Sequence, residues 1–301
     1  MPTTQTFDPL HSPETVAQPS IDHIVRRRRP VATVGSIVGL VILIVAAVFA
    51  LGPLLWTLTT SLRTPAESFD NPPQWLPLSW DFSNYAAVFD QIPIGQFFLN
   101  SVVVTLLIVV GQTVTCTLSG YAFAMISFPG KNTVFGIFLA TMLVPIQTII
   151  ITVFVILKDI GLTGSIASLI VPALGSAFGT FLMRTAFLNM PPELEEAARM
   201  DGANPFQTFW RIMLPLARPS ISVLAITTVL WSWNELLWPL VVSTRAEDMP
   251  LAAGLATLSS DRTIDYPVLM AASLMAMAPV LIMFVVLQRR VMDGLASSGL
   301  K

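Results

Sequence analysis

Charged side chains are scarce in this chain of 301 residues, of which 11% are charged and 54% hydrophobic. A water-soluble domain uses about 25% charged residues to cover its surface. The composition therefore excludes an ordinary soluble globular protein and indicates a membrane protein. The net charge of -2 is less informative than the positions of the charges along the chain.

Cysteine and histidine are nearly absent. Cys116 is the single cysteine and lies in an apolar run, which excludes a disulfide framework and a cysteine metal site. His11 and His23, the two histidines, both lie in the N-terminal tail. The rest of the chain thus has no histidine for catalysis or metal binding, and we expect no metal and no other cofactor.

Long apolar runs make up most of the chain. A membrane-spanning helix needs about 20 predominantly apolar residues, and six runs reach that length. They are 33–60, 97–124, 133–157, 165–187, 218–243 and 266–288. None alternates apolar and polar residues as a half-buried strand does. The sequence therefore predicts an all-α membrane protein with six transmembrane helices.

Nearly every run has a helix breaker near its middle. The breakers are Pro53, Gly111, Pro145, Pro172, Pro239 and Pro279. Membrane helices tolerate such residues because neighbouring helices satisfy the freed backbone groups. The first run follows a long polar tail and exceeds the apolar region of a signal peptide, so we expect it to stay as a transmembrane helix.

The basic residues predict the orientation. With a cytoplasmic N-terminus, the inner segments hold 12 of the 16 Lys and Arg residues, and the outer segments hold Arg63, Lys158, Arg245 and Arg262. The inner ones are Arg26 to Arg29, Lys131, Arg184, Arg199, Arg211, Arg218, Arg289, Arg290 and Lys301. This bias follows the positive-inside rule and predicts that both termini are cytoplasmic.

The segments between the spans complete the expected organisation. Residues 1–30 are rich in Pro, Thr and Ser and predict a disordered cytoplasmic tail. The "RRRR" near the end of this tail, at 26–29, is more typical of a topology anchor beside the first transmembrane helix, 31–62, than of a nucleic-acid site. Residues 63–94 predict an extracytoplasmic segment in which prolines prevent a long helix. A second outer segment covers about 245–265, and residues 290–301 are a cytoplasmic tail.

Six charged residues gather between the fourth and fifth runs, in "EEAARMDGANPFQTFWRIMLPLARP" at positions 195 to 219. Pro191 and Pro192 suit a helix start, where the missing N–H costs nothing. Glu195 and Arg199 lie four residues apart and can pair on one helix face. Gly202 then predicts the end of this helix, because glycine readily adopts a left-handed cap.

A second short helix is predicted directly after this bend. Asn204 suits the N-cap, Pro205 the first helical position and Gln207 the third position of a capping box. An apolar stripe at helical spacing follows, formed by Phe206, Phe209, Trp210 and Met213. Such a protruding helix pair is typical of docking into another protein's groove. A loop lying on the membrane surface explains these residues equally well.

The same segment resembles the EAA loop of bacterial ABC-importer permeases. Glu196-Ala197-Ala198, three residues, Gly202, nine residues and Ile212-x-Leu214-Pro215 match its pattern at every position. The resemblance extends from about position 60 to the C-terminus through "NSVVVT", "GYAFAMISFPGKN", "MLVPIQT", "FGTFLMRTAF", "WNELLWPL" and "QRRVMDGLASSGLK". These stretches are similar to MalG-like carbohydrate permeases, including the glycerol-3-phosphate permeases. The C-terminal "GLASSGLK" is slightly closer to some glycerol-3-phosphate members.

The resemblance implies a type I ABC importer fold, with a transmembrane domain over 95–289 and an EAA loop over 189–219. It implies two homologous permeases, two cytoplasmic ABC ATPase subunits and an extracytoplasmic solute-binding protein. The residues that would couple to the ATPase are Glu196, Ala197, Ala198, Asp201, Gly202, Ile212, Leu214 and Pro215. The chain itself has no G-x-x-x-x-G-K-[ST] phosphate loop, so ATP hydrolysis would belong to a partner and the chain would not be an enzyme.

The fifth run contains the best candidates for a solute path. Trp231, Asn234, Glu235 and Trp238 are spaced to share one face of a continuous helix. Indole rings beside polar groups suit a sugar, and an ionisable group inside a membrane span usually faces protein or water. Packing of this face against the second permease, or support of an outer gate, explains these residues better, because the solute can lie mostly on the other permease. Gln147, after Pro145, is a further candidate, whereas Thr105, Gln112 and Thr113 are more typical of helix packing.

Two other classes of function fit parts of the sequence. An ion-gradient-driven secondary transporter would also have kinked spans, but it usually contains inverted repeats, and the two halves of this chain show no obvious repeat. A membrane enzyme would need a cluster of reactive side chains near one membrane face, and the sequence offers none. The solute could be a sugar, an oligosaccharide, a polyol or sn-glycerol 3-phosphate.

Overall fold

The computed structural model describes residues 34–69, 75–259 and 265–299. The chain divides into two compact units, Met1–Gly52 and Pro53–Lys301. The first unit contains the beginning of α1, whose residues up to Gly52 include no charged side chain. A helix that is apolar on all sides fits the first predicted transmembrane helix. The expected tail, 1–30, lies outside the described residues.

The described part of the chain is helical and has no strand. Its α-helices are α1 Val34–Ser61, α2 Ser83–Gln91, α3 Ile94–Met125, α4 Lys131–Ala140, α5 Ile146–Asp159, α6 Ile166–Ile170, α7 Ala177–Leu188, α8 Glu193–Met200, α9 Pro205–Thr208, α10 Leu214–Leu216, α11 Arg218–Asn234, α12 Leu237–Val242, α13 Leu251–Leu258 and α14 Tyr266–Gly299. Short 3-10 turns are Glu67–Phe69, Thr141–Leu143, Val171–Ala173 and Ala246–Asp248, and Phe209–Met213 is a π-helix.

Six of these stretches are long and apolar enough to cross a membrane when each bent pair counts as one span. Three are single helices: Gly35–Ser61, Ile94–Met125 and Tyr266–Val285. Three are bent pairs: Lys131–Leu143 with Ile146–Asp159 at 101°, Ile166–Ala173 with Ala177–Leu188 at 42°, and Pro205–Leu216 with Arg218–Asn234 at 73°. The all-α fold with six candidate spans agrees with the sequence prediction.

The helix breakers act in different ways. Pro145 and Pro172 lie at breaks, whereas Pro53 and Pro279 lie inside continuous helices. In the fifth run the helix does not break at Pro239. It ends at Asn234, and Pro239 lies in the first turn of α12, where its missing N–H needs no intrahelical partner. The continuous helix predicted over 218–243 is therefore wrong.

Helix α3 satisfies the backbone groups that the break between α6 and α7 leaves open. The Gln112 amide donates to the Ala173 carbonyl at 2.8 Å, the Thr115 hydroxyl donates to the Leu174 carbonyl, and the Cys116 thiol lies 3.5 Å from the Ser176 carbonyl. In an apolar environment an unsatisfied carbonyl costs several kcal/mol, about 2–7 by transfer data. The polar residues of α3 thus make the broken span possible.

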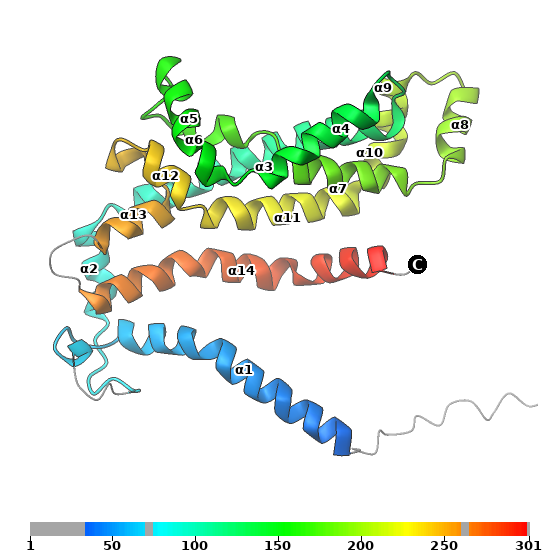
Figure 1. The fold of residues 1–301 in the computed structure, drawn as a ribbon. Helices are drawn as coiled ribbons and strands as arrows, with labels where there is room; N and C mark the ends of the chain where they lie inside the picture. Colours follow the sequence, from blue (N-terminus) through cyan, green and yellow to red (C-terminus); the bar gives the residue numbers. More distant parts are fainter. Residues whose placement is uncertain (1–33, 70–74, 260–264, 300–301) are drawn as a thin grey trace, which may run out of the picture. The chain divides into compact units, whose positions relative to one another are not determined.

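Helix α3 also bonds to α11. The Thr228 hydroxyl donates to the side-chain amide oxygen of Gln112 at 3.0 Å, and the hydroxyls of Thr105 and Ser232 lie 3.2 Å apart. The helix-packing role predicted for Thr105 and Gln112 is confirmed. Helix α3, drawn in teal in Figure 1, packs against both α7 and α11.

Two glycines bring α3 and α7 into backbone contact. A Cβ added to Gly120 would lie 2.5 Å from the Met183 Cβ and 2.8 Å from the Arg184 nitrogen. A Cβ added to Gly179 would lie 2.8 Å from the Cys116 sulfur. Small residues allow such close helix crossings, which are the main source of packing energy between helices in a lipid environment.

Apolar cores stabilise the two ends of this helix group. One end has a cluster with Val88, Phe97, Leu251 and Val268 from α2, α3, α13 and α14. The opposite end has a cluster that joins α3, α7 and the segment before α11. Figure 1 shows α2 and α13 at the first end and α8 to α10 at the second.

The predicted polar segments contain short helices. The described residues of 63–94, which are 63–69 and 75–94, contain the 3-10 turn and α2 rather than a long helix, and Trp75 and Trp80 are exposed, as expected for side chains at a membrane interface. Tyr85 instead packs against the apolar cluster that contains Val88 and Phe97, and its hydroxyl lies 2.9 Å from the Ser61 hydroxyl. At the other terminus α14 continues to Gly299, so residues 290–299 extend the last helix.

Candidate functional site

The first half of the loop between α7 and α11 folds as its sequence predicts. Helix α8 begins after Pro192, and the Arg199 guanidinium lies 2.9 Å from the Glu195 carboxylate. Gly202 has a φ of 78°, in the left-handed region that glycine tolerates without strain. Its N–H donates to the Arg199 carbonyl and so closes the end of α8. The predicted bend at Gly202 is confirmed.

The second half of the loop contains the predicted capping box. The Gln207 N–H donates to the Asn204 side chain at 2.8 Å, and the Gln207 side chain accepts from the Asn204 N–H at 3.0 Å. The prediction of a single apolar stripe is wrong, because the chain becomes a π-helix at Phe209. Phe209 and Met213 are buried in the core of the chain, whereas Phe206 and Trp210 are exposed.

The residues of the EAA pattern divide into two groups. The exposed group is Glu196, Ala197, Asp201 and Gly202. Ala198 is buried, and Ile212, Leu214 and Pro215 are half-buried. The second group thus anchors the loop to its own chain, and the first group remains available to another molecule.

Large apolar side chains surround the exposed group. Met200 is 88% exposed, Phe206 68% and Trp210 51%, and α8 lies beyond the ends of the long helices (Figure 1). Exposed aromatic and Met side chains at a rigid, capped bend have the composition of a protein-docking surface.

A second candidate site is a cavity of about 630 Å³ between α3, α5, α6, α11 and α12. Its wall is mainly apolar, and its polar side chains include Gln112, Thr227, Thr228 and Ser232. Glu235 is the one charged residue among the described residues that line it. Cavities of this size that combine apolar walls with few polar groups are typical of small-molecule sites.

The structure brings together three of the five predicted path residues. Trp231, Glu235 and Trp238 line the cavity. Asn234 is exposed outside this lining, and its amide donates to the Leu230 carbonyl at 2.7 Å. Gln147 is also exposed and does not line the cavity. The predicted common helix face is wrong, because the helix ends at Asn234 and Glu235 has an extended backbone.

Hydrogen bonds hold the break in the fifth run. The Glu235 carboxylate accepts from the Trp238 N–H at 3.1 Å, and the Trp238 indole donates to the Ser168 carbonyl at 3.1 Å. The carboxylate therefore stabilises the start of α12 as a helix-capping acceptor does. The indole ties α12 to α6 across the cavity wall.

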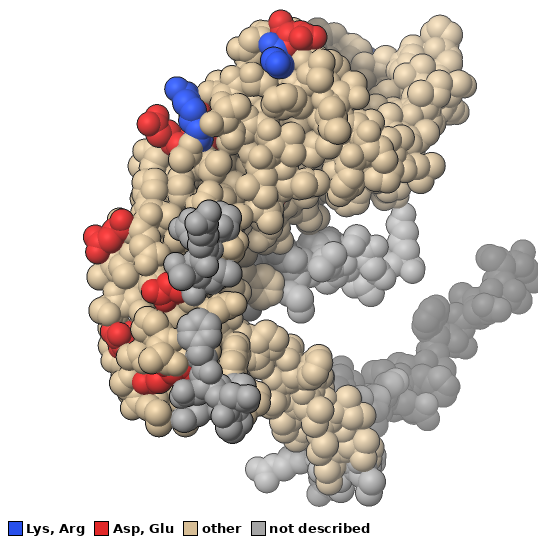
Figure 2. Space-filling view, turned by 60° about the vertical axis from the view of Figure 1, so that its left-hand side comes forward, with Lys and Arg blue, Asp and Glu red and all other residues tan. Residues whose placement is uncertain are grey.

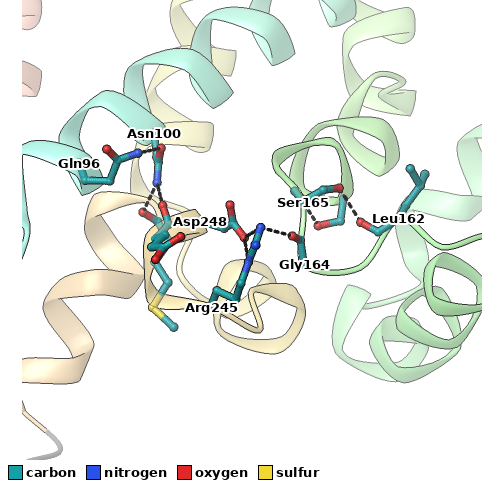
Figure 3. A network of polar contacts seen from close by, with 10 residues as sticks. Gln96, Asn100, Leu162, Gly164, Ser165, Arg245 and Asp248 are labelled. Carbon is teal, nitrogen blue, oxygen red and sulfur yellow. Dashed lines mark hydrogen bonds and ion pairs between the residues drawn. The ribbon is translucent and has the colours of Figure 1, made fainter.

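A polar network closes the end of the helix group that carries α12 and α13 (Figure 3). The Arg245 guanidinium lies 2.9 Å from the Asp248 carboxylate and donates to the Gly164 carbonyl at 3.1 Å. The Asn100 amide donates to the Glu247 and Met249 carbonyls at 2.6 Å and 3.1 Å. We name these contacts of Arg245 and Asn100 the clasp, because they join the 160–165 turn, the 244–250 segment and α3. Pro250, at the end of this segment, lines the cavity.

The two ends of the helix group differ in charge. The end that carries α2, α12 and α13 presents more acidic than basic side chains (Figure 2), including Asp81, Asp90, Glu247 and Asp248. The Ser83 hydroxyl, which donates to the Asp81 carboxylate at 2.6 Å, lowers the pKa of Asp81. The Ser79 hydroxyl has the same effect on the pKa of Glu67.

Comparison with known proteins identifies the chain. The family described as "Binding-protein-dependent transport system inner membrane component" matches residues 116–294. The chain belongs to this family. It is the permease subunit of an ABC importer and lies in the inner membrane with several spans. Permeases of this kind work with ATPase and solute-binding-protein partners, and membership excludes the alternative of a secondary transporter.

Several characterised permeases are similar over most of their length. The diacetylchitobiose uptake system permease NgcG of Streptomyces coelicolor is 33% identical over 86% of each chain. The arabinooligosaccharides permease AraQ of Halalkalibacterium halodurans is 32% identical over 92% of this permease and 99% of that one. The sn-glycerol-3-phosphate permease UgpE of Pectobacterium atrosepticum is 32% identical over 86% and 95%.

A solved structure shows the same fold. It is the crystal structure of a bacterial ABC transporter involved in the import of the acidic polysaccharide alginate, and one of its chains has a TM-score of 0.77 to this permease at 26% identity. The match covers 86% of this permease and 96% of that chain.

Sequence reasoning missed several residues that hold the permease together. Arg245 and Asn100 of the clasp were not singled out, because each bonds to a carbonyl far away in sequence. Tyr121 was also missed, although it is one of only three tyrosines in the chain. A buried tyrosine in a membrane span signals a partner for its hydroxyl, but the sequence does not identify that partner.

Proposed function

We propose that this permease pairs with a second homologous permease and that two ATPase subunits bind below them. An extracytoplasmic binding protein delivers the solute from the other side. Both termini are cytoplasmic, so the end that carries α8 faces the ATPase and the end with the clasp faces outward. The charge bias supports this orientation, because Lys131, Arg184, Arg199 and Arg211 lie toward the α8 end.

The observation that carries the proposal is the form of the loop over 189–219. Its exposed group, Glu196, Ala197, Asp201 and Gly202, lies at a rigid bend beside exposed Met200. Leu214 of the second group packs with Phe209 and Met213 in the core that joins α3 and α7, and these contacts fix the loop to the membrane helices. We infer that α8 seats in a cleft of the ATPase and transmits ATP binding and hydrolysis to the membrane helices.

The solute class follows from the cavity and the relatives. We infer a carbohydrate, because Trp231 and Trp238 offer indole faces and Glu235 offers a hydrogen-bond acceptor for sugar hydroxyls. Among the described residues no Lys or Arg lines the cavity, and a phosphate ester would need cationic partners. A sugar or oligosaccharide therefore fits this subunit better than sn-glycerol 3-phosphate. Substitutions of Glu235 decide whether the solute contacts this subunit or mainly its partner permease.

Substitution of Gly202 tests the coupling role. A residue with a Cβ loses about 1–2 kcal/mol in a left-handed conformation. A Cβ at Gly202 meets nothing within 4 Å, so the side chain of Gly202→Arg extends outward from the permease toward its partner. We expect Gly202→Arg to insert and to pair with the second permease, but to lose the ATPase subunit or its stimulation by liganded binding protein.

Gly161→Arg is the matched control. Gly161 has a φ of 72° and equally open surroundings, so it imposes the same backbone strain at the opposite end. Co-purification of the ATPase and its stimulated hydrolysis rate are measured for both variants. Retention of both properties by Gly202→Arg would show that the loop is not the coupling element.

The solute class is tested on the external binding protein of this importer. A ligand at 100 times its Kd stabilises a protein by about 2.7 kcal/mol, which a melting curve resolves. We expect oligosaccharides to raise its melting temperature. A response to sn-glycerol 3-phosphate alone would overturn the assignment.

A further inference from the structure

Tyr121, near the end of α3, contacts the end of α7 and the middle of the EAA loop. Its side chain is 6% exposed. Its ring lies 5.5 Å from the ring of Phe187, before the loop, and 4.9 Å from that of Phe209, within it. Its hydroxyl donates to the carbonyl of Pro205, the first residue of α9, at 3.1 Å.

The hydroxyl of Tyr121 links α3 to the EAA loop by a hydrogen bond. Helix α11 begins at Arg218, so the part of the EAA loop before it is 189–217. Among the described residues, the bond of Tyr121 to Pro205 is the one side-chain hydrogen bond between this part and the rest of the permease. The other links are apolar contacts in the core that contains Tyr121, Phe187, Phe209 and Met213. Apolar contacts allow sliding, whereas a hydrogen bond has a preferred direction and distance.

The same helix reaches the cavity. Val104, Ile108 and Gln112 of α3 line it. Gln112 and Tyr121 are nine residues apart, which corresponds to about 14 Å along a helix. One continuous helix thus contacts the cavity and holds the EAA loop.

We propose that Tyr121 is a positioning residue that makes the EAA loop follow α3. Its hydroxyl fixes the start of α9, and its ring contacts Phe187 before the loop and Phe209 within it. A change in the tilt of α3 at the cavity is thereby carried to α8, and a movement of α8 on the ATPase is carried back to the cavity wall. This inference rests on the proposed coupling role of the loop.

A simple packing role predicts something different. Phenylalanine has the same ring and fills the same space, so a packing residue tolerates Tyr121→Phe. The positioning role requires the hydroxyl, and its loss frees α9 while the core remains filled. The readout must therefore report coupling between transport and hydrolysis rather than assembly alone.

The experiment uses the complete importer in lipid vesicles with its binding protein and a transported oligosaccharide. Measurements are the basal ATPase rate, the stimulation by liganded binding protein and the number of solute molecules imported per ATP. We expect Tyr121→Phe to assemble with normal basal activity. Its stimulation and solute-to-ATP ratio should fall about two- to tenfold, the range of equilibrium constants that one hydrogen bond controls.

Tyr85→Phe is the matched control, because it removes a hydroxyl bonded to Ser61 at the opposite end of the permease. It should leave both coupling measures unchanged. Wild-type coupling in Tyr121→Phe would overturn the inference, and so would loss of assembly, since the residue would then act in folding. An unmodified importer that shows neither stimulation nor import would instead refute the proposed function.

Discussion

Glu235 has two structural roles, which substitutions of its side chain can separate. Its carboxylate lines the cavity and also accepts from the Trp238 N–H at the start of α12. Loss of a helix-capping acceptor costs about 1 kcal/mol. Any effect beyond that cost belongs to the cavity.

Two substitutions of Glu235 distinguish these roles. Glu235→Gln keeps an acceptor oxygen for Trp238 and removes the charge, whereas Glu235→Leu removes both. We expect the Gln variant to assemble with a normal melting temperature and to lose several-fold in solute uptake, and the Leu variant to lose more of both. Normal uptake by the Gln variant, with a defect in the Leu variant alone, would assign Glu235 to the cap and place the solute on the partner permease.

At the scale of elements, the breaks in the spans decide how the cavity is built. Three runs that the sequence presents as single helices are bent pairs or separate helices in the structure. The clasp joins the ends of two of these runs, because Arg245 follows α12 and Gly164 precedes α6. In the proposed orientation this end faces outward and solute meets these segments first, so we expect the clasp to oppose opening of that end.

Arg245→Ala tests this effect. The pair with Asp248 is largely exposed on the arginine side, so its loss is worth about 0.2–1 kcal/mol. We expect ATPase activity without binding protein to rise about 1.5- to 5-fold at low salt. High salt should bring the unmodified permease closer to the variant, because salt screens exposed charges.

Lys158→Ala provides the control for Arg245→Ala. Lys158 is an exposed cation at the end of α5. Its removal changes the net charge by the same amount and leaves the clasp intact. An equal rise in basal activity for both variants would attribute the effect to net charge and contradict the clasp.

The sequence predicted these elements well where local chemistry determines them. The bend at Gly202 and the capping box at Asn204 depend on neighbouring residues, and both are confirmed. The predicted faces of the fifth run and of the second loop helix were wrong. Each assumed 3.6 residues per turn, whereas one helix ends at Asn234 and the other widens into a π-helix at Phe209. Tertiary contacts of α3 and α6 decide those departures, and a single sequence does not contain them.

At the scale of the whole molecule, the orientation in the membrane rests on the charge bias. Thiol labelling in intact cells with the outer membrane removed tests it directly. Asp90→Cys and Ser259→Cys place thiols at exposed positions of α2 and after α13, and Met200→Cys places one at the end of α8. The native Cys116 is buried, so it contributes little background.

We expect a membrane-impermeant reagent to label the first two variants and not the third. After the membrane is permeabilised, the Met200→Cys variant should react, which shows that its thiol is accessible. Labelling of Met200→Cys in intact cells would invert the orientation and remove the basis for docking α8 on a cytoplasmic ATPase.

The number of spans and the family could be predicted from the sequence because apolar length and the EAA spacing are properties of the chain alone. The choice between a cavity residue and an interface residue could not, since it depends on which helices lie next to each other. Gln147 shows the difference, because its position after Pro145 suggested the path and the structure leaves it outside the cavity.

The backbone contact at Gly120 gives spectroscopists a fixed internal reference. With no room for even a methyl group between α3 and α7, these helices cannot slide past each other without separating. A pair of spin labels, one on each helix, should therefore report one unchanged distance in every nucleotide state. Distances between label pairs that include α5, α6 or α12 can then be compared with this unchanged α3–α7 distance.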